Sequence, residues 1–309
     1  MTTRPTTESL IETYLRTLTS PQTKKTYNTE LKMFVCFMEE RLGKEDLGSL
    51  TAEDISIYRE RIMGLYSRAT VAKKLAALRR FLTFTFMGGF TRVNPEAIRF
   101  FARSPKVEQD SSYNVLTDDE LSRMLSAART SNYRDYVMIA LMASCGLREA
   151  EVVGVVVGDF RDMGADSDGA ETLSLRVVGK GERVRNVSVS PELWTLVQNF
   201  VLRCGMSFAS QSDMKRPLFQ SREGNCRPLT TRSVRYIIKK YAERAGITKQ
   251  ISPHSIRHTV GTNMAVNEAP LIVIQQFLGH RDPKTTMRYI RRAEELASKA
   301  HRYNTLPIN

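Results

Sequence analysis

The stretch Ser252–Tyr289 contains the run Ser-Pro-His254-Ser-Ile-Arg257-His258, then a helical pattern and Leu-Gly-His280, and it ends nine positions later at Tyr289. His254, Arg257 and His258 are spaced i, i+3 and i+4, so they share one face of a helix. A guanidinium can bind the non-bridging oxygens of a phosphodiester, imidazoles can transfer protons, and a phenol can attack phosphorus. The stretch therefore predicts part of a site for phosphodiester chemistry.

Length and charge narrow the class of protein. The chain has 309 residues, 41% of them apolar, which suits two globular domains. Its formal charge of +13 and its isoelectric point near 9.7 predict attraction to a polyanion, of which nucleic acid is the commonest. A membrane surface is the competing partner, but the sequence shows no lipidation signal, polybasic tail, signal peptide or membrane-spanning run. We therefore expect a cytoplasmic protein that binds nucleic acid.

Metal-binding patterns are weak in this sequence. The four cysteines stand singly, without CxxC spacing, at Cys36, Cys145, Cys204 and Cys226. His254 and His258 could be zinc ligands at i and i+4, but the usual glutamate between them is absent and Arg257 would repel a cation. We expect no metal and no cofactor.

Residues 9 to about 100 predict a bundle of about four helices. Apolar residues recur there at helical spacing, and no strand pattern interrupts them. Residues 104–114 are polar and aperiodic and contain Pro105, which is typical of an interdomain linker. We therefore place a helical domain at 1–103, the linker at 104–114 and a second domain at 115–309.

Basic side chains are interleaved along these predicted helices. They are Lys24, Lys25, Lys32, Arg68, Lys73, Lys74, Arg79 and Arg80. Most charged helix faces are simply solvated, whereas the positive charge of the whole chain favours a DNA-facing surface that contacts mainly phosphates. Both interpretations are open on the sequence alone.

The second domain begins with the signature of a helix start. Thr117 and Glu120 have the spacing of a capping box. Further along, an apolar helical run ends at Gly146, and Arg148 then opens another helix. The charge of Arg148 gains nothing from the helix dipole at that end, so another group must hold it, and Glu151 lies one turn away.

Residues 172–190 alternate apolar and polar side chains on both sides of Gly-Lys180-Gly-Glu, which predicts a β-hairpin with Lys180 at its tip. The acidic, glycine-rich segment 162–169 lacks the closing glutamate of a calcium loop, and we expect a mobile loop there. After Tyr289, residues 291–303 predict an amphipathic C-terminal helix.

Four motifs of this chain resemble those of the tyrosine recombinases, the family of the phage integrases, the Xer recombinases and Cre. The motifs are Gly146-Leu-Arg148-Glu-Ala-Glu151, Gly179-Lys180-Gly-Glu-Arg-Val-Arg185, His254-Ser-Ile-Arg257-His258, and Leu278-Gly-His280 followed by Tyr289. Their order and spacing agree with the family, and the resemblance runs from about residue 9 to the end. It implies a mainly α fold, in which a SAM-like helical core-binding domain precedes a mostly helical catalytic domain with a small antiparallel sheet.

The resemblance also implies which residues bind the scissile phosphate. Arg148 and Arg257 should clamp it and neutralise the charge that builds in the transition state, and His280 should donate a hydrogen bond to it. Glu151 should support Arg148. Glu149 departs from the family, where an apolar residue is more usual beside that arginine.

The remaining roles concern protons and the nucleophile. By the resemblance, Tyr289 attacks to form a 3′-phosphotyrosine, with His254 assisting its proton transfer and Lys180 protonating the 5′ oxygen that leaves. His258 is expected to support the site from behind. Because the energy of the phosphodiester is kept in the covalent intermediate, the reaction needs neither ATP nor a divalent metal.

With this resemblance, we expect the chain to act on double-stranded DNA with two inverted half-sites, as a dimer on one site and a homotetramer on two. In the family, the C-terminal helix docks on a neighbouring protomer, although packing on its own domain is an alternative here. The biological role stays open between integration, excision and the resolution of a mobile element or replicon dimer. Two other functions stay open: a catalytically silent DNA-binding accessory protein, and a type IB topoisomerase.

Overall fold

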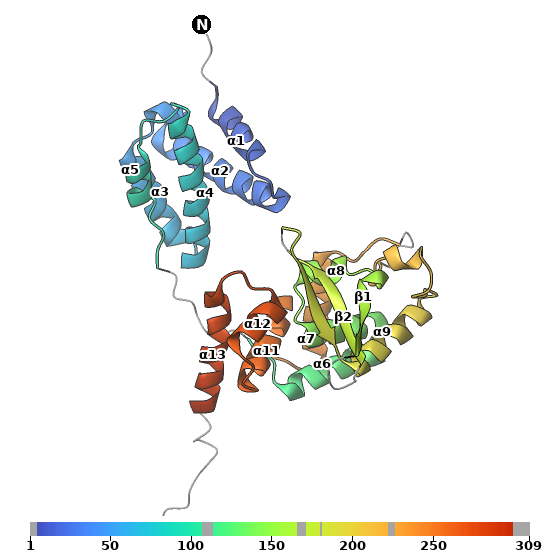
Figure 1. Ribbon diagram of the computed structural model, residues 1–309. Coiled ribbons are helices and arrows are strands. Elements are labelled where there is room, and N and C mark those ends of the chain that lie inside the picture. The colour runs from blue at the N-terminus through green and yellow to red at the C-terminus, as the bar shows by residue number, and fades with distance from the viewer. Residues whose placement is uncertain (1–4, 107–113, 166–170, 180, 222–225, 299–309) are drawn as a thin grey trace, which may run out of the picture. The chain divides into compact units, whose positions relative to one another are not determined.

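The computed structural model describes residues 5–106, 114–165, 171–179, 181–221 and 226–298 (Figure 1). The chain divides into two compact units, Met1–Gln109 and Asp110–Asn309. Most of the predicted linker at 104–114 lies outside the described residues.

The N-terminal unit is a helical bundle, and its described residues form no strand. Its helices are α1 (Thr7–Arg16), α2 (Pro21–Leu42), α3 (Ala52–Leu65), α4 (Arg68–Met87) and α5 (Pro95–Phe101), with a short 3-10 helix at Leu47–Ser49. Leu31 and Phe34 of α2 and Leu75 and Phe81 of α4 are among the side chains that fill its core. The predicted helical bundle is therefore confirmed.

Helix α5 makes a fifth α-helix among the described residues of this unit, where the sequence predicted about four. The Asn94 side chain accepts a hydrogen bond from the backbone N–H of Ala97, at 2.8 Å, and so caps this helix. Proline is well tolerated at the first helical position, since its missing N–H would have no partner there in any case.

The C-terminal unit is mostly helical and carries a small sheet. Its helices are α6 (Asp118–Ser131), α7 (Tyr133–Cys145), α8 (Glu149–Gly154), α9 (Pro191–Arg203), α10 (Thr231–Arg244), α11 (Pro253–Val266), α12 (Leu271–Leu278) and α13 (Pro283–Ser298), with short 3-10 helices at Val157–Asp159 and Asp213–Lys215. The capping box is confirmed: Thr117 accepts from the Glu120 N–H, and Glu120 accepts from the Thr117 N–H at 2.7 Å. Helix α7 lies in the centre of the core with Val137, Ile139 and Leu141 fully buried.

The sheet has the antiparallel order β1-β2-β3, with β1 at Phe160–Ala165, β2 at Glu171–Val178 and β3 at Val184–Val189. The predicted hairpin is confirmed as β2 and β3, paired from Leu173 with Val189 to Val178 with Val184. Strand β1 corrects the expectation of a loop at 162–169, because Asp162 pairs with Leu173 and Ala165 with Glu171. Residues 166–170 lie outside the described part. Backbone pairing at a sheet edge tolerates acidic side chains, so the acidic composition of β1 did not predict a strand.

Helices α11, α12 and α13 follow one another in the chain and pack together at one side of this unit (Figure 1). Helix α13 begins at Pro283, not near 291 as predicted, so Tyr289 lies within a helix rather than before one. Residues 299–303 of the predicted tail helix lie outside the described residues. Within the described chain, no helix combines the length and apolar character needed to cross a membrane.

Candidate active site

Glu151, at the start of α8, is the carboxylate around which the C-terminal unit gathers arginines. Its Oε1 accepts hydrogen bonds from Arg148 Nη1 at 2.7 Å and from Arg185 Nη1 at 2.8 Å, and its Oε2 accepts from Arg185 Nη2 at 2.9 Å. Arg257 Nη1 lies 3.8 Å from the same Oε2. Burial alone would raise the pKa of Glu151, but the hydrogen bonds and charge of Arg185, aided by Arg148, lower it to about 2. Glu151 is therefore ionised at neutral pH, and its predicted contact with Arg148 is present.

Glu149, the unusual acid of this motif, has a different partner. Its carboxylate accepts a hydrogen bond from Arg235 Nε of α10 at 2.7 Å, and Arg235 Nη2 donates to the other oxygen. Of the two acids beside Arg148, Glu151 is the one that holds it.

Arg257, on α11, is only 2% exposed. Its Nη1 donates to the carbonyl of Gly146 at 2.6 Å, and its Nη2 donates to the carbonyl of Leu278. Burial, followed by the nearby charge of Arg148, lowers the pKa of Arg257 to about 9, so it stays cationic at neutral pH. These bonds join α11 to the ends of α7 and α12.

Two glycines make this arrangement possible. Gly146 ends α7 with φ of 58° and Gly279 ends α12 with φ of 64°, in the left-handed region that favours glycine. A Cβ on Gly146 would lie 2.6 Å from a leucine methyl of α12, and one on Gly279 would lie 3.0 Å from Arg185 Cδ. The turns after these glycines deliver Arg148 and His280 to the site.

The arginine cluster, defined here as Arg148, Arg185 and Arg257, carries more positive charge than its carboxylate can neutralise. Among the described residues, Glu151 is the carboxylate that pairs with all three, and no second acid forms an ion pair with any of them. The Arg148 side chain is 32% exposed, against 13% for Arg185 and 3% for Arg257. The excess charge is therefore accessible from solvent at Arg148, where an anion such as phosphate could bind.

Tyr289, on α13, is 2% exposed and packs against α11. A Cβ on Gly261 of α11 would lie 2.7 Å from Tyr289 Cζ, so only glycine leaves room for the ring. The Tyr289 hydroxyl forms a hydrogen bond with His258 Nδ1 at 2.9 Å. His258, expected to support the site from behind, is therefore in direct contact with the expected nucleophile.

His280 lies beside the same tyrosine. The two rings are stacked, with centroids 5.8 Å apart and an angle of 20° between their planes. His280 Nδ1 forms a hydrogen bond with Oγ1 of the fully buried Thr286 at 2.9 Å. Burial, then the charges of Arg257 and Arg148, lowers the pKa of His280 to about 3. The imidazole is therefore neutral at physiological pH.

His254 lies in the first turn of α11 and is exposed. Its ring centroid is 6.3 Å from that of His258, which is in turn 5.6 Å from the Tyr289 ring. The predicted helical face is therefore present. Lys180 lies outside the described residues, and the described backbone next to it closes the hairpin through a hydrogen bond from the Gly179 N–H to the Arg183 carbonyl at 2.7 Å. Among the described residues, no group of histidine, cysteine and acidic side chains could hold a metal ion.

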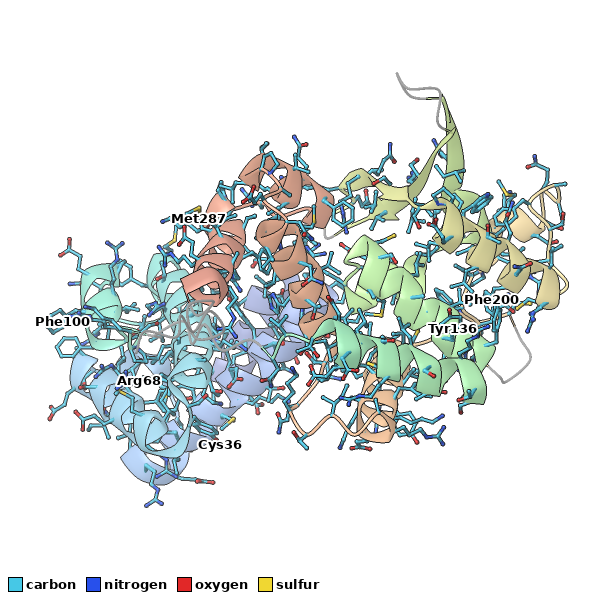
Figure 2. All side chains as sticks on the ribbon, turned by 90° about the horizontal axis from the view of Figure 1, so that it is seen from below. Cys36, Arg68, Phe100, Tyr136, Phe200 and Met287 are labelled. Atoms are coloured by element: carbon cyan, nitrogen blue, oxygen red, sulfur yellow. The ribbon has the colours of Figure 1, made fainter. Side chains whose placement is uncertain are left out.

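The basic residues predicted to face DNA have different environments in the N-terminal unit. Exposed side chains are found at Lys25, Lys32, Arg68, Lys73 and Arg80, and Lys24 and Arg79 are half-buried. Arg68 stands at the start of α4 (Figure 2). Arg79 Nη1 donates to the Ala102 carbonyl at 2.7 Å, which ties α4 to the end of α5.

Lys74 does not fit a DNA-facing surface. It is 4% exposed, forms an ion pair with Glu30, and has its Nζ 4.5 Å from the centre of the Tyr66 ring. Lys74 lies on the face of α4 that packs against α2, and the spacing of basic residues in the sequence did not reveal its burial.

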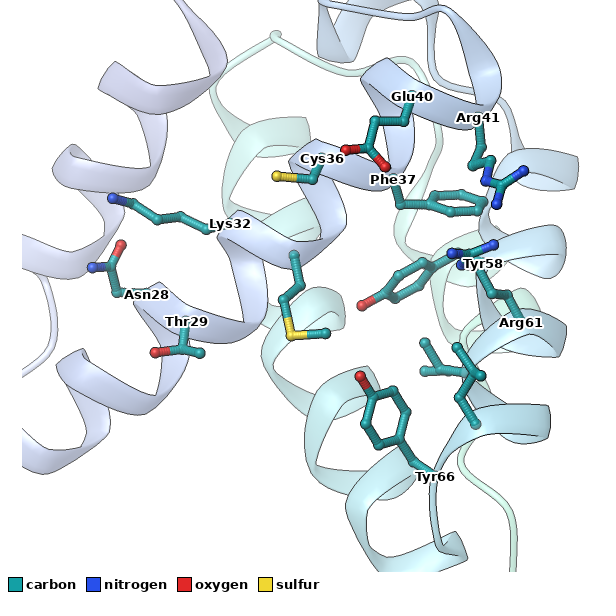
Figure 3. Close-up of a pocket in the computed structure, with 13 residues that line it drawn as sticks. Asn28, Thr29, Lys32, Cys36, Phe37, Glu40, Arg41, Tyr58, Arg61 and Tyr66 are labelled. Carbon is teal, nitrogen blue, oxygen red and sulfur yellow. The ribbon is translucent and has the colours of Figure 1, made fainter.

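Lys32 also lines a pocket of about 460 Å³ between α2 and α3 (Figure 3). The hydroxyls of Tyr58 and Tyr66 point toward its interior, and Arg41 and Arg61 lie on the side of the pocket opposite Lys32 (Figure 3). None of the residues expected to perform the chemistry lines it.

Two residues of the site were missed by sequence analysis. Arg185 was noted only as part of a motif, although it alternates with buried Val187 and Val189 on one face of β3, and a charged side chain on such a face signals a buried partner. Thr286 gave no signal, because a threonine in a helix is ordinary until its neighbour is known.

A mostly helical unit with a small antiparallel sheet thus brings together an arginine cluster, the half-buried imidazoles of His258 and His280, and a buried tyrosine. This fold and this grouping define the class of the tyrosine recombinases.

Comparison with known proteins gives the same class. The model of the phage integrase family matches residues 114–295, and that of the phage integrase N-terminal SAM-like domain matches residues 11–87. The chain belongs to the phage integrase family, the tyrosine recombinases, which are enzymes that cleave and rejoin DNA.

The relatives match along most of their length. The chain is 29% identical to tyrosine recombinase XerC of Pelobacter propionicus over 91% of this chain and 90% of the relative, and 30% identical to XerC of Syntrophus aciditrophicus over 87% of each. Among solved structures, XerH recombinase bound to a palindromic difH substrate has a TM-score of 0.71 at 17% identity, covering 91% of this chain and 79% of that one. A lambda integrase dimer on a core site has a TM-score of 0.67 at 15% identity, covering 92% and 95%. These structures share the fold.

Proposed function

We propose that this chain is a site-specific recombinase that breaks and rejoins DNA strands through a 3′-phosphotyrosine at Tyr289. The observation that carries the proposal is the excess positive charge at Arg148 and Arg257, held on the same unit as Tyr289 and His280. Phosphoryl transfer depends mainly on positioning and on stabilising negative charge, and this arrangement provides a binding site for that charge.

In the proposed step, Tyr289 Oη attacks the scissile phosphorus while the bond from phosphorus to the 5′ oxygen breaks. Arg148 and Arg257 bind the non-bridging oxygens, and His280 donates a hydrogen bond to one of them. The phenol proton passes to His254, and Lys180 protonates the departing 5′ oxygen. A 5′ hydroxyl from a partner strand reverses the attack and releases Tyr289.

The proposed substrate is double-stranded DNA with two inverted half-sites, bound by a dimer, with a homotetramer joining two such sites in the cytoplasm. Relatives of the same fold support this, since XerH is solved on a palindromic substrate and lambda integrase as a dimer on a core site. The exposed cations of α2 and α4 would contact phosphates. The reaction serves integration, excision or resolution of a mobile element or replicon dimer.

The nucleophile can be tested without knowing the target sequence. The full-length protein is incubated with a library of nicked duplexes of random sequence, and DNA that remains covalently bound in detergent is recovered and sequenced. We expect mass spectrometry to find a nucleotide 3′-linked to the peptide that contains Tyr289. Tyr289→Phe should give no adduct, while Tyr236→Phe, at an exposed tyrosine of α10, should give the wild-type amount. An adduct on another residue, or one linked through a 5′ phosphate, would refute the proposal.

Lys180 can be tested on any duplex recovered in this way. Lys180→Ala should slow adduct formation severely on normal DNA. On DNA with sulfur in place of the leaving 5′ oxygen, the defect should largely disappear, because a thiolate leaves without a proton. A defect of equal size on both substrates would remove Lys180 from the acid role.

A further inference from the structure

The side chain of Tyr289 is enclosed within the C-terminal unit. It is 2% exposed, its ring stacks on His280 with centroids 5.8 Å apart, and Gly261 leaves space for it on α11. An attacking atom must come within about 3 to 3.5 Å of the phosphorus. A phenol as enclosed as this one does not present its oxygen to a DNA backbone, so its position must change before attack.

The hydroxyl group of Tyr289 has a defined partner in this enclosed position. Nδ1 of the half-buried His258 lies 2.9 Å from the phenol oxygen. Burial, followed by the charge of Arg288, lowers the pKa of His258 to about 4, so the ring is neutral at physiological pH. One nitrogen of a neutral imidazole can accept a hydrogen bond. Packing against Gly261 positions the Tyr289 ring, and the hydrogen bond to His258 also fixes the direction of the hydroxyl oxygen.

We propose that His258 is a positioning residue that holds the Tyr289 hydroxyl in this withdrawn position, and that the nucleophile is released when the hydrogen bond is exchanged. The inference rests on the proposed function, because only a reactive tyrosine needs to be released. It goes beyond that function by giving His258 a role separate from that of exposed His254. Both histidines lie on α11, so one helix carries the group that holds the phenol and the group that assists its reaction.

The geometry also identifies two internal references. Tyr241 is another fully buried tyrosine of the same unit, and its hydroxyl donates to Asp135 Oδ2 at 3.1 Å. Tyr236, on α10, is 68% exposed. Any treatment that loosens the whole unit should affect Tyr241, whereas release of the nucleophile should affect Tyr289 alone.

The test is nitration of tyrosines by tetranitromethane in the full-length protein without DNA, read for each tyrosine by peptide mass spectrometry. In the wild type, we expect Tyr236 to react quickly and both Tyr289 and Tyr241 to be protected. His258→Phe keeps a ring of similar size but cannot accept the hydrogen bond, and it should raise the nitration rate of Tyr289 about fivefold. His258→Asn places an amide oxygen close to the position of Nδ1, and it should restore the protection.

Each outcome decides the proposal. Unchanged protection of Tyr289 in His258→Phe overturns it, as does a rate in the wild type equal to that of Tyr236. A parallel rise at Tyr241 counts against it as well, because the whole unit would then have loosened. Failure of the asparagine variant to protect Tyr289 would also contradict it. Since the measurement uses no DNA, it is independent of the adduct experiment: loss of the adduct role of Tyr289 would leave the nitration pattern in place.

Discussion

Buried Lys74 in the N-terminal unit and the partly buried arginine cluster in the C-terminal unit both withdraw positive charge from water, but carboxylates neutralise that charge to different extents. Lys74 has one carboxylate, Glu30, and the face of Tyr66. Arg148, Arg185 and Arg257 share the carboxylate of Glu151. Burying charge is costly unless it is paired. A balanced pair therefore suits a structural role, whereas an unbalanced cluster is completed by an anion from outside.

The largest expected effect comes from changing a member of the unbalanced cluster. Arg257→Lys keeps the positive charge but removes the planar guanidinium. Only the guanidinium can donate hydrogen bonds to the carbonyls of Gly146 and Leu278 and to a phosphate at the same time. We expect the single-turnover rate of adduct formation to fall about a thousandfold. Arg123→Lys, at an exposed arginine paired with Asp119, is the matched control and should leave the rate unchanged. A loss of less than tenfold at Arg257 would contradict the role proposed for the cluster.

The second expected effect compares the two carboxylates. Glu151→Gln leaves three arginines without their partner and should reduce the unfolding free energy of the C-terminal unit by about 3 to 5 kcal/mol. Glu30→Gln should cost its own unit about 1 to 2 kcal/mol, because the glutamine amide oxygen can still accept a hydrogen bond from Lys74 and the ammonium still lies over Tyr66. Hydrogen exchange in increasing urea measures each unit separately. Equal losses in the two variants would remove the distinction between balanced and unbalanced charge.

The third effect is the pH dependence of the same carboxylate. The pKa of Glu151 is lowered from 4.5 to about 2 on folding, so its ionised form stabilises the protein above pH 4.5. That contribution, about 3 kcal/mol, should be lost as the pH falls from 4.5 toward 2. Stability of the C-terminal unit measured across this range should decline in the wild type, and the decline should be smaller in Glu151→Gln. Identical slopes would show that other acids dominate.

The smallest expected effect tests Thr286, whose hydroxyl meets His280 Nδ1. Thr286→Val keeps the shape but releases the ring, and it should lower the adduct rate about tenfold with unchanged stability. Thr286→Ser should restore the rate, and Thr285→Val at the neighbouring position should leave it unaltered. Nitrogen NMR shifts of His280 should show a changed tautomer in Thr286→Val alone. An unchanged tautomer would leave Thr286 with a packing role.

Much of the fold could be predicted, because local patterns carried it. The capping box at Thr117, the hairpin between β2 and β3, and the helical repeat of the N-terminal unit each follow from residues close in sequence. Strand β1 could not be predicted, since its pairing with β2 does not depend on its own apolar pattern. The burial of Lys74 was missed for a similar reason, because its partner Glu30 is 44 residues away.

The sequence by itself determined which chemical groups are available and in what order: Arg148, His254, Arg257, His280 and Tyr289 all occur in recognisable motifs. Only the tertiary structure decided how they meet. It paired Glu149 with Arg235, brought Arg185 to Glu151 and Thr286 to His280, and placed the Tyr289 hydroxyl against His258. The physical reason is that helix and turn signals act over a few residues, whereas hydrogen bonds and ion pairs among buried groups join segments far apart in the chain and depend on how those segments pack.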